Sequence, residues 1–349
     1  MLADVFGGVL LMGRHATPRP FPTSSNVVIP RLVRRWIWVA IVIVIGIAAL
    51  VMIGDVRLLA ERLGTFGWWA FLAALGLSLT NYAIRFLRWQ LYLRWQGVKV
   101  PTGSSALVFG AGLSLSITPA KLGELVKSYL LRELHDIPPT LTAPIVVAER
   151  VTDLIALLTL AIVGVAYYGV QTTLVLAAGG IIFLGLILLA WPRPTNALLD
   201  LVTRPKLTRK YRESLHQVYD GLASLCRPGR LGIATAIALP SWACECVGFA
   251  LICNAFPGTQ VDLGLAMVIY AATSIAGALS FLPGGLGVTE GAMTILLVQS
   301  AAHIDQATAL DATLLTRLAT LWFAVLLGLV LLAIARGRIA ARTARARDD

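Results

Sequence analysis

Charge is scarce in this chain. Only 13% of its 349 residues are Asp, Glu, Lys or Arg, about half the share that is typical of a soluble domain. In contrast, 58% are hydrophobic, and the mean hydropathy is +0.80. This composition excludes an ordinary soluble protein. Because several apolar runs approach the roughly 20 residues that cross a bilayer, we expect an all-α, polytopic membrane protein.

Cysteine and histidine are also rare, with four residues of each. The cysteines are too few and too poorly spaced for a disulfide framework or a zinc site, and three of them lie in one apolar run as expected packing residues. The histidines are scattered along the chain. We therefore expect no metal site and no cofactor. The formal charge of +11 falls mostly in particular loops, as the positive-inside rule requires, so it does not indicate a nucleic-acid partner.

The apolar runs predict six spanning helices. We place them at residues 36–54, 66–87, 141–168, 172–191, 231–256 and 312–335. Between them lie pairs of shorter apolar segments, at 104–118 with 122–134 and at 263–282 with 292–302.

Basic residues set the expected orientation. The flexible tail 1–30, the loops 88–99 and 193–230, and the tail 339–349 are basic and are assigned to the cytoplasm. Both termini are then cytoplasmic, and each short pair must return to the face from which it started. The pattern is helix, helix, re-entrant hairpin, helix, with a second copy of opposite orientation. This predicts an inverted-topology repeat in one domain, 31–338, with halves near 31–168 and 172–338. Full crossings by each short arm are the alternative, but about 11 residues cover only about half of the hydrocarbon core.

Two similar stretches interrupt the short pairs. Leu115–Glu124 and Leu279–Val288 share Leu, Ser, Pro, Leu and Gly at a constant offset, 279 − 115 = 164. Proline removes a backbone donor and glycine permits positive φ, so each stretch should break a helix. Paired breaks in the two halves of a membrane protein indicate a transport site. Tight helix packing is the alternative role of the glycines.

The second break is the more explicit candidate for ligand binding. Gly284, Gly285 and Gly287 would allow a ligand to approach the backbone, and we expect Thr289 to cap the returning half-helix. Free amides at that helix start, with the helix dipole behind them, favour an anion.

Ionisable residues also lie within the apolar segments, where a charge needs a partner or water. They are Lys121, Glu124, Lys127, Glu149, Arg150, Asp153, Glu245, Glu290 and Arg317. Glu124 and Lys127 can pair, and Glu149 and Asp153 share a helix face from which Arg150 points away. A cavity lined by Lys121, Arg150 and Arg317 would suit a phosphate. The structural alternative is that these charges only lock the hairpins to the helices.

The basic loop 193–230 contains apolar residues at helical spacing. They are Leu207, Tyr211, Leu215, Val218, Leu222 and Leu225. The spacing predicts an amphipathic helix, which either lies on the membrane surface or packs on the neighbouring protein.

Several of these motifs together resemble the lysylphosphatidylglycerol synthase transmembrane-region family, the flippase-like domain. The matching stretches are Arg85–Trp89, Phe109-Gly110, Ser116–Tyr129, Glu149–Asp153 and Leu282–Gly291. The resemblance implies a bacterial inner-membrane protein that moves lipids between leaflets. Since no soluble aminoacyl-transfer domain follows the last helix, we expect no synthesis of lysylphosphatidylglycerol by this chain.

The leading hypothesis is therefore a lipid translocator that is not an enzyme. Its partners would be the bilayer and a lipid with a phosphate-containing headgroup. A membrane-embedded glycosyltransferase or phosphatase is the second hypothesis, although no His–Asp or Asp–Asp motif lies on a loop. The third is a non-transporting partner of a lipid-synthesis enzyme, and a homo-oligomer remains open.

Overall fold

The fold was analysed in a computed structural model, which describes residues 56–118, 123–168, 212–301 and 304–348. Regular secondary structure in these ranges is helical, as expected. The predicted spans 36–54 and 172–191, the tail 1–30 and Lys121 lie outside the described residues. Three of the described helical stretches are long and apolar enough to cross a membrane: Trp68–Trp95, Pro228–Asn254 and Gln306–Arg342.

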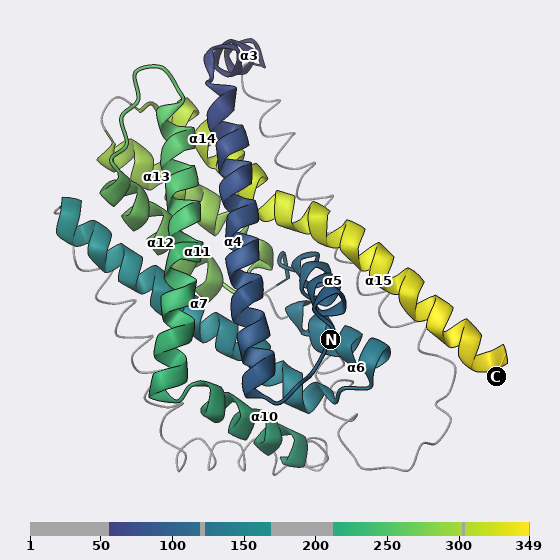
Figure 1. The fold of residues 1–349 in the computed structure, drawn as a ribbon. Coiled ribbons are helices and arrows are strands. Elements are labelled where there is room, and N and C mark those ends of the chain that lie inside the picture. The colour runs from purple at the N-terminus through teal and green to yellow at the C-terminus, as the bar shows by residue number, and fades with distance from the viewer. Residues whose placement is uncertain (1–55, 119–122, 169–211, 302–303, 349) are drawn as a thin grey trace.

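Two long helices, α4 (Trp68–Trp95) and α11 (Pro228–Asn254), pack against each other at the centre of the molecule (Figure 1). Pro228 starts α11, where its missing N–H costs nothing. Helix α4 continues past the predicted span 66–87 to Trp95 and includes Arg88, whose buried side chain pairs with Asp153 of the later helix Pro139–Tyr168.

Each short apolar pair forms two helices around a break. The first pair is α5 (Thr102–Leu113) and α6 (Val126–His135), and the second is α12 (Leu263–Leu279) and α13 (Val288–Ser300). The helices of each pair contact each other. Figure 1 shows the two pairs on opposite sides of α4 and α11.

A long helix follows each pair. Helix α7 (Pro139–Tyr168) packs against α12, and α15 (Phe323–Asp348) packs against α5. Helix α14 (Gln306–Arg317) precedes α15 and joins it through one π-helical turn, η5 (Leu318–Trp322). Helix α14 starts before residue 312, where the last span was predicted to begin. Its start is set by Asp305, which caps α14 by accepting from the Thr308 amide at 2.9 Å. Hydrogen bonds from Thr308 hold the pKa of Asp305 below its ordinary value.

Glycines set the closest helix crossings. A Cβ on Gly328 of α15 would lie 2.1 Å from the backbone nitrogen of Ser114, at the end of α5. A Cβ on Gly164 of α7 would lie 2.6 Å from the carbonyl oxygen of Gly264 on α12. Both crossings therefore exclude a side chain, which is the role of small residues between membrane helices. Gly164 and Gly328 are also separated by 164 residues (328 − 164).

The basic loop contains α10 (Arg212–Leu225), which packs against α7. Val218, Leu222 and Leu225 join the hydrophobic clusters beneath it, and the Gln96 side chain donates to the Gly221 carbonyl oxygen. Of the two alternatives for this amphipathic helix, the structure shows packing on the neighbouring protein. Leu207 and Tyr211 lie outside the described residues. A further short helix, α3 (Val56–Thr65), precedes α4.

Candidate functional site

The two breaks in the short apolar pairs meet. A Cβ on Gly284 in the second break would lie 3.2 Å from a side-chain carbon of Ile117 in the first. Ile117 and Leu286 share a small buried cluster with Leu321 of the π-helical turn and Val325 of α15. Segments 164 residues apart in the sequence are thus joined at one point, beside an irregular turn of the last helix. Irregular turns of this kind are frequent at functional sites.

Glycine conformation shapes the second break. Gly284 and Gly287 have φ of +61° and +83°, which glycine adopts without a steric cost. The prediction that Thr289 caps α13 is wrong: Gly287 precedes the helix, and its amide donates to Glu290 Oε2 at 2.7 Å. Thr289 is buried and packs against Gly277 and Gly285 instead, because α13 starts one residue earlier than the predicted cap.

Arg317 ties the last helix to this break. Its Nε donates to Glu290 Oε1 at 2.7 Å, and its Nη2 donates to the Gly284 carbonyl oxygen at 2.6 Å. Sequence analysis named Arg317 as a lining residue of a phosphate cavity, and the structure places it in direct contact with the second break. We call Gly284, Gly287, Glu290 and Arg317 the second-break group.

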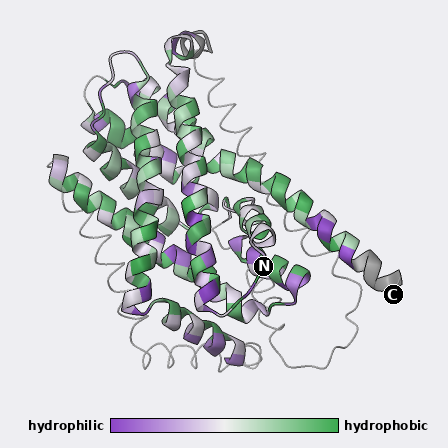
Figure 2. Ribbon diagram, viewed as in Figure 1, coloured by the Kyte–Doolittle hydropathy of each residue, from purple (hydrophilic) through white to green (hydrophobic). Residues whose placement is uncertain are grey.

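A larger charged group surrounds the start of α6 and the first half of α7. We call it the first-break group; its members are Arg85, Arg88, Glu124, Lys127, Glu149, Arg150 and Asp153. In Figure 2 hydrophilic segments gather where the lower part of α4 meets α7, between predominantly hydrophobic helices. Lys127 Nζ donates to Glu149 at 2.5 Å and to Glu124 at 3.2 Å, so the expected Glu124–Lys127 pair is present.

Arg150 belongs to the first-break group, although we expected it to point away from Asp153. Its Nη2 lies 3.1 Å from Asp153 Oδ2 and 3.4 Å from Glu124 Oε2. The long side chain bends back over one helical turn, so an (i, i+3) ion pair replaces the separation that helix geometry alone suggested. Its side chain is 20% exposed, against 6% or less for the other cations of the group.

Sequence reasoning left Arg85 and Arg88 out of the site. Arg88 donates to Asp153 at 2.7 Å and to Thr152, and Arg85 Nη2 lies 3.6 Å from Glu124 Oε1. A signal was available: Ser78, Asn81, Arg85 and Arg88 recur at helical spacing on an otherwise apolar span. A polar stripe of this kind marks the face that avoids lipid, and all four residues are buried.

Arg85 is incompletely satisfied. Its Nε and Nη2 atoms are buried, and no hydrogen-bond acceptor reaches them among the residues that the structure describes. Buried donors without acceptors are uncommon in native proteins. In the same group, Arg88 Nε, Arg150 Nε and Glu149 Oε1 are also buried without a hydrogen-bond partner among the described residues.

A third polar group lies between α4, α11 and α12. The Asn81 side-chain amide donates to Glu245 Oε1 at 2.6 Å, the Tyr270 hydroxyl donates to Glu245 Oε2, and Ser241 donates to Asn81. We call these four residues the central group. Among the described residues no ion pair links the first-break and second-break groups.

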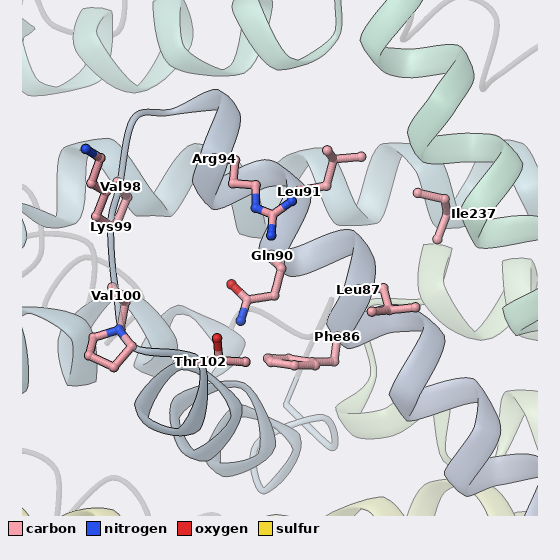
Figure 3. Close-up of a pocket in the computed structure, with 11 residues that line it drawn as sticks. Phe86, Leu87, Gln90, Leu91, Arg94, Val98, Lys99, Val100, Thr102 and Ile237 are labelled. Atoms are coloured by element: carbon pink, nitrogen blue, oxygen red, sulfur yellow. The ribbon is translucent and has the colours of Figure 1, made fainter.

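A groove of about 690 Å³ opens beside the C-terminal half of α4. Gln90 and Arg94 extend from α4 toward Thr102, while Leu87 and Leu91 lie on the side of Ile237 from α11 (Figure 3). Lys99 in the following loop also lines it. The groove thus combines two cations with an apolar wall, and sequence analysis did not identify it.

Comparison with known proteins gives consistent matches. Residues 37–328 match the family described as the lysylphosphatidylglycerol synthase TM region. A UPF0104 membrane protein of Methanothermobacter thermautotrophicus is 26% identical over 317 residues, covering 83% of this chain and 93% of the relative. A UPF0104 membrane protein of Methanocaldococcus jannaschii is 25% identical over 232 residues, covering 64% of this chain and 94% of the relative. The family match spans most of the chain and confirms the resemblance drawn from the motifs. This chain belongs to the lysylphosphatidylglycerol synthase TM region family.

Proposed function

We propose that this protein moves a lipid with a phosphate-containing headgroup between the two leaflets of a bacterial inner membrane. The observation that carries the proposal is the meeting of the two helix breaks at Ile117 and Gly284, with a charged group beside each break. Non-helical backbone is tolerated at membrane depth only where protein or water covers it. Such a point suits a headgroup that must leave water during transfer.

An inverted repeat is the arrangement that best accounts for the helix contacts. If α4, α5, α6 and α7 correspond to α11, α12, α13 and α14–α15, the contact of α5 with α15 corresponds to that of α12 with α7. The contacts of α5 with α6 and of α6 with α7 likewise correspond to those of α12 with α13 and α13 with α14. A two-fold relation in the membrane plane favours alternating access by movement of one half against the other.

Charge balance favours an anionic headgroup at the first break. The first-break group has four cations (Arg85, Arg88, Lys127 and Arg150) and three carboxylates (Glu124, Glu149 and Asp153), a formal surplus of one positive charge. Arg85 also has donors without acceptors. A phosphate would accept from them, with Arg150, the most exposed of these cations, as its first contact.

The groove beside α4 fits the same ligand. Arg94 and Lys99 can hold a phosphate, and Leu87, Leu91 and Ile237 offer an apolar wall to the chains. By the positive-inside rule these cations lie on the cytoplasmic side. We propose that lipid of the cytoplasmic leaflet binds here before transfer. Arg94→Glu with Lys99→Glu should then lower the transport rate at low lipid content more than at high content, whereas Arg338→Ala should not.

Reconstitution tests the main proposal. Purified protein in liposomes should move fluorescent or radiolabelled lipids with phosphate-containing headgroups between leaflets without changing them chemically. Mass spectrometry of lipids that co-purify with the protein would select the headgroups to test.

Other outcomes would overturn the proposal. A chemically altered lipid would indicate a membrane enzyme, such as a glycosyltransferase or phosphatase. No movement of any co-purifying lipid, together with stable binding of a lipid-synthesis enzyme, would indicate a non-transporting partner.

A further inference from the structure

Glu245 has a different environment from the other buried carboxylates of the site. Glu124, Glu149, Asp153 and Glu290 each form an ion pair with Lys or Arg. Glu245 is 92% buried (8% exposed), and no Lys or Arg among the described residues lies within 4.0 Å of its carboxylate. Its two oxygens are held instead by neutral donors, the Asn81 amide and the Tyr270 hydroxyl.

The surroundings of Glu245 contain few charges. Helix α4 contributes Tyr82 and Arg85, which interact with Glu245 only through longer-range electrostatics. Among the other helices that pack against α11, α12 carries Tyr270, which bonds to Glu245, α14 carries Arg317 and Asp311, and α7 carries Asp153. Arg317 and Asp153 are bound to Glu290 and Arg88, and Asp311 is bound to Arg62. Among the described residues none of these cations forms an ion pair with Glu245, and Arg85, which has donors without acceptors, acts on its carboxylate only at longer range.

An unpaired carboxylate at membrane depth is costly, and taking up a proton removes the charge. The central group can accommodate both forms. Asn81 now donates Nδ2–H to the carboxylate, and rotation of its amide would present Oδ1 as an acceptor to the protonated acid. Ser241 already bonds to Oδ1 of Asn81 at 3.4 Å, so the amide has a partner whose hydroxyl can turn to follow it.

The central group also lies where the two halves of the proposed repeat meet. Asn81 and Glu245 are separated by 164 residues (245 − 81), the offset of the two breaks. They are therefore equivalent positions of the two halves, and they contact each other. The central group therefore contacts both halves of the proposed repeat, and any movement of one half against the other would act on it.

We propose that Glu245 is a proton-binding site that couples proton movement to the lipid transport proposed above. The carboxylate takes up one proton to become a neutral acid that donates to Asn81 Oδ1, and it later releases that proton to the other side. The ligand is the proton alone. The inference deepens the proposed function and rests on it for the coupling, although not for proton binding itself.

Infrared spectroscopy tests proton binding without any transport assay. The purified full-length protein in lipid nanodiscs should show a carbonyl band of a protonated carboxylic acid that grows as the pH falls. The band should be absent in Glu245→Gln and unchanged in Glu213→Gln, a matched change on the exposed surface of α10. A Glu245-dependent band that is absent, constant with pH, or governed by Na⁺ concentration at fixed pH would overturn the proposal.

The repeat offers a rescue experiment. Glu245→Asn should abolish the band, and the double exchange Asn81→Glu with Glu245→Asn should restore it, because the carboxyl and the amide then exchange equivalent places. A structural hydrogen bond would not produce a pH-dependent band in the double variant. Loss of the band in a double variant that still folds, judged by its melting temperature, would contradict the assignment.

Transport measurements test the coupling. In liposomes with an imposed pH gradient, wild type should move lipid faster than without the gradient, and Glu245→Gln should lose this gradient-dependent part. If wild type moves no lipid while the infrared band titrates, the proposed function fails and proton binding stands. If wild type moves lipid at a rate that no pH gradient alters, the coupling is wrong.

Discussion

Lys127 is enclosed on every side by protein. Its ammonium group lies between Glu124 and Glu149 and 4.6 Å from the centre of the Trp89 ring, and the side chain is 1% exposed. The aliphatic part of the Lys127 side chain packs against Gly112, where a Cβ would lie 2.5 Å from Lys127 Cγ. At this residue the structural alternative from sequence analysis is well supported, since the charge locks α6 to α7.

Removing this cation should destabilise the protein strongly. Lys127→Met keeps most of the volume but removes the ion-pair partner of Glu149 and one of the three cations around Glu124. Breaking a buried pair in this way costs about 3–5 kcal/mol. The free energy of unfolding in mixed micelles measures the effect. Lys99→Met at the exposed groove loop should change it by less than about 0.5 kcal/mol. Equal stability of the two variants would exclude the locking role.

Arg150 is expected to act on the ligand rather than on stability. Its side chain is the most exposed cation of the first-break group, and its ion pairs with Glu124 and Asp153 are 3.4 Å and 3.1 Å long. Arg150→Ala should abolish lipid transport in liposomes. Arg150→Lys should restore it only in part, because the charge remains but bidentate phosphate contact is lost.

The matched control for this prediction is Arg338→Ala, an exposed change near the end of α15. Full transport by a folded Arg150→Ala protein would remove Arg150 from the binding site.

Candidate site residues were predictable where a charged side chain lies inside an apolar run. Lys127, Glu149 and Arg317 were selected because a charge inside an apolar run requires a partner, and each has one. Their partners were predictable only within one helix, as for Glu124 with Lys127. Arg88 with Asp153 pairs residues 65 apart, and no local spacing rule specifies such a contact.

At the scale of elements, the crossing of α15 over α5 depends on a missing side chain. Gly328→Ala would place a methyl group against the backbone of Ser114, which cannot move aside as a side chain can. We expect a loss of about 1–3 kcal/mol in the free energy of unfolding, as for other overpacked contacts. Gly337→Ala in the same helix meets no atom within 4 Å and should be neutral or slightly stabilising. Similar melting temperatures for both variants would show that the crossing is loose.

The positions of the helix breaks were predictable, whereas the start of the helix that follows the second break was not. Proline and glycine specify by covalent geometry where a helix must stop. Helix α5 ends at Leu113, before the first motif, and α12 ends at Leu279, the first residue of the second. The start of α13 was misplaced because Thr289 is a good capping residue by type. The observed cap depends on Glu290 reaching back to the Gly287 amide, a contact that α13 and Arg317 position together.

At the scale of the whole molecule, movement of the two halves requires the breaks to separate. Ile117→Cys with Gly284→Cys, in a background without the four native cysteines, should form a disulfide because the side chains would be adjacent. Oxidation should then block lipid transport, and a reductant should restore it.

The control is Gly284→Cys alone, which carries the backbone strain of a side chain at φ +61° without the cross-link. Undiminished transport by the oxidised double variant would exclude separation of the breaks at this contact.

The contact between the breaks was beyond sequence analysis. The repeated motif predicted two similar helix breaks, and the positions of the basic residues predicted that the two hairpins enter from opposite faces of the membrane. Neither observation specifies whether the two breaks contact each other. That depends on how α4 and α11 pack and how far α15 extends past α5. We expected one cavity ringed by Lys121, Arg150 and Arg317; Lys121 lies outside the described residues, and Arg150 and Arg317 have different ion-pair partners.

The π-helical turn at Leu318–Trp322 has a mechanical consequence. A π turn holds an extra residue, and if this insertion moves along the helix, each residue that it passes turns by about 100° around the axis. Arg317 stands at the N-terminal edge of the turn. A shift of the insertion by one position would swing its guanidinium away from Glu290 and the Gly284 carbonyl while the helix stays wound. The contacts of Arg317 with the second break therefore depend on where in the last helix the π-helical turn lies.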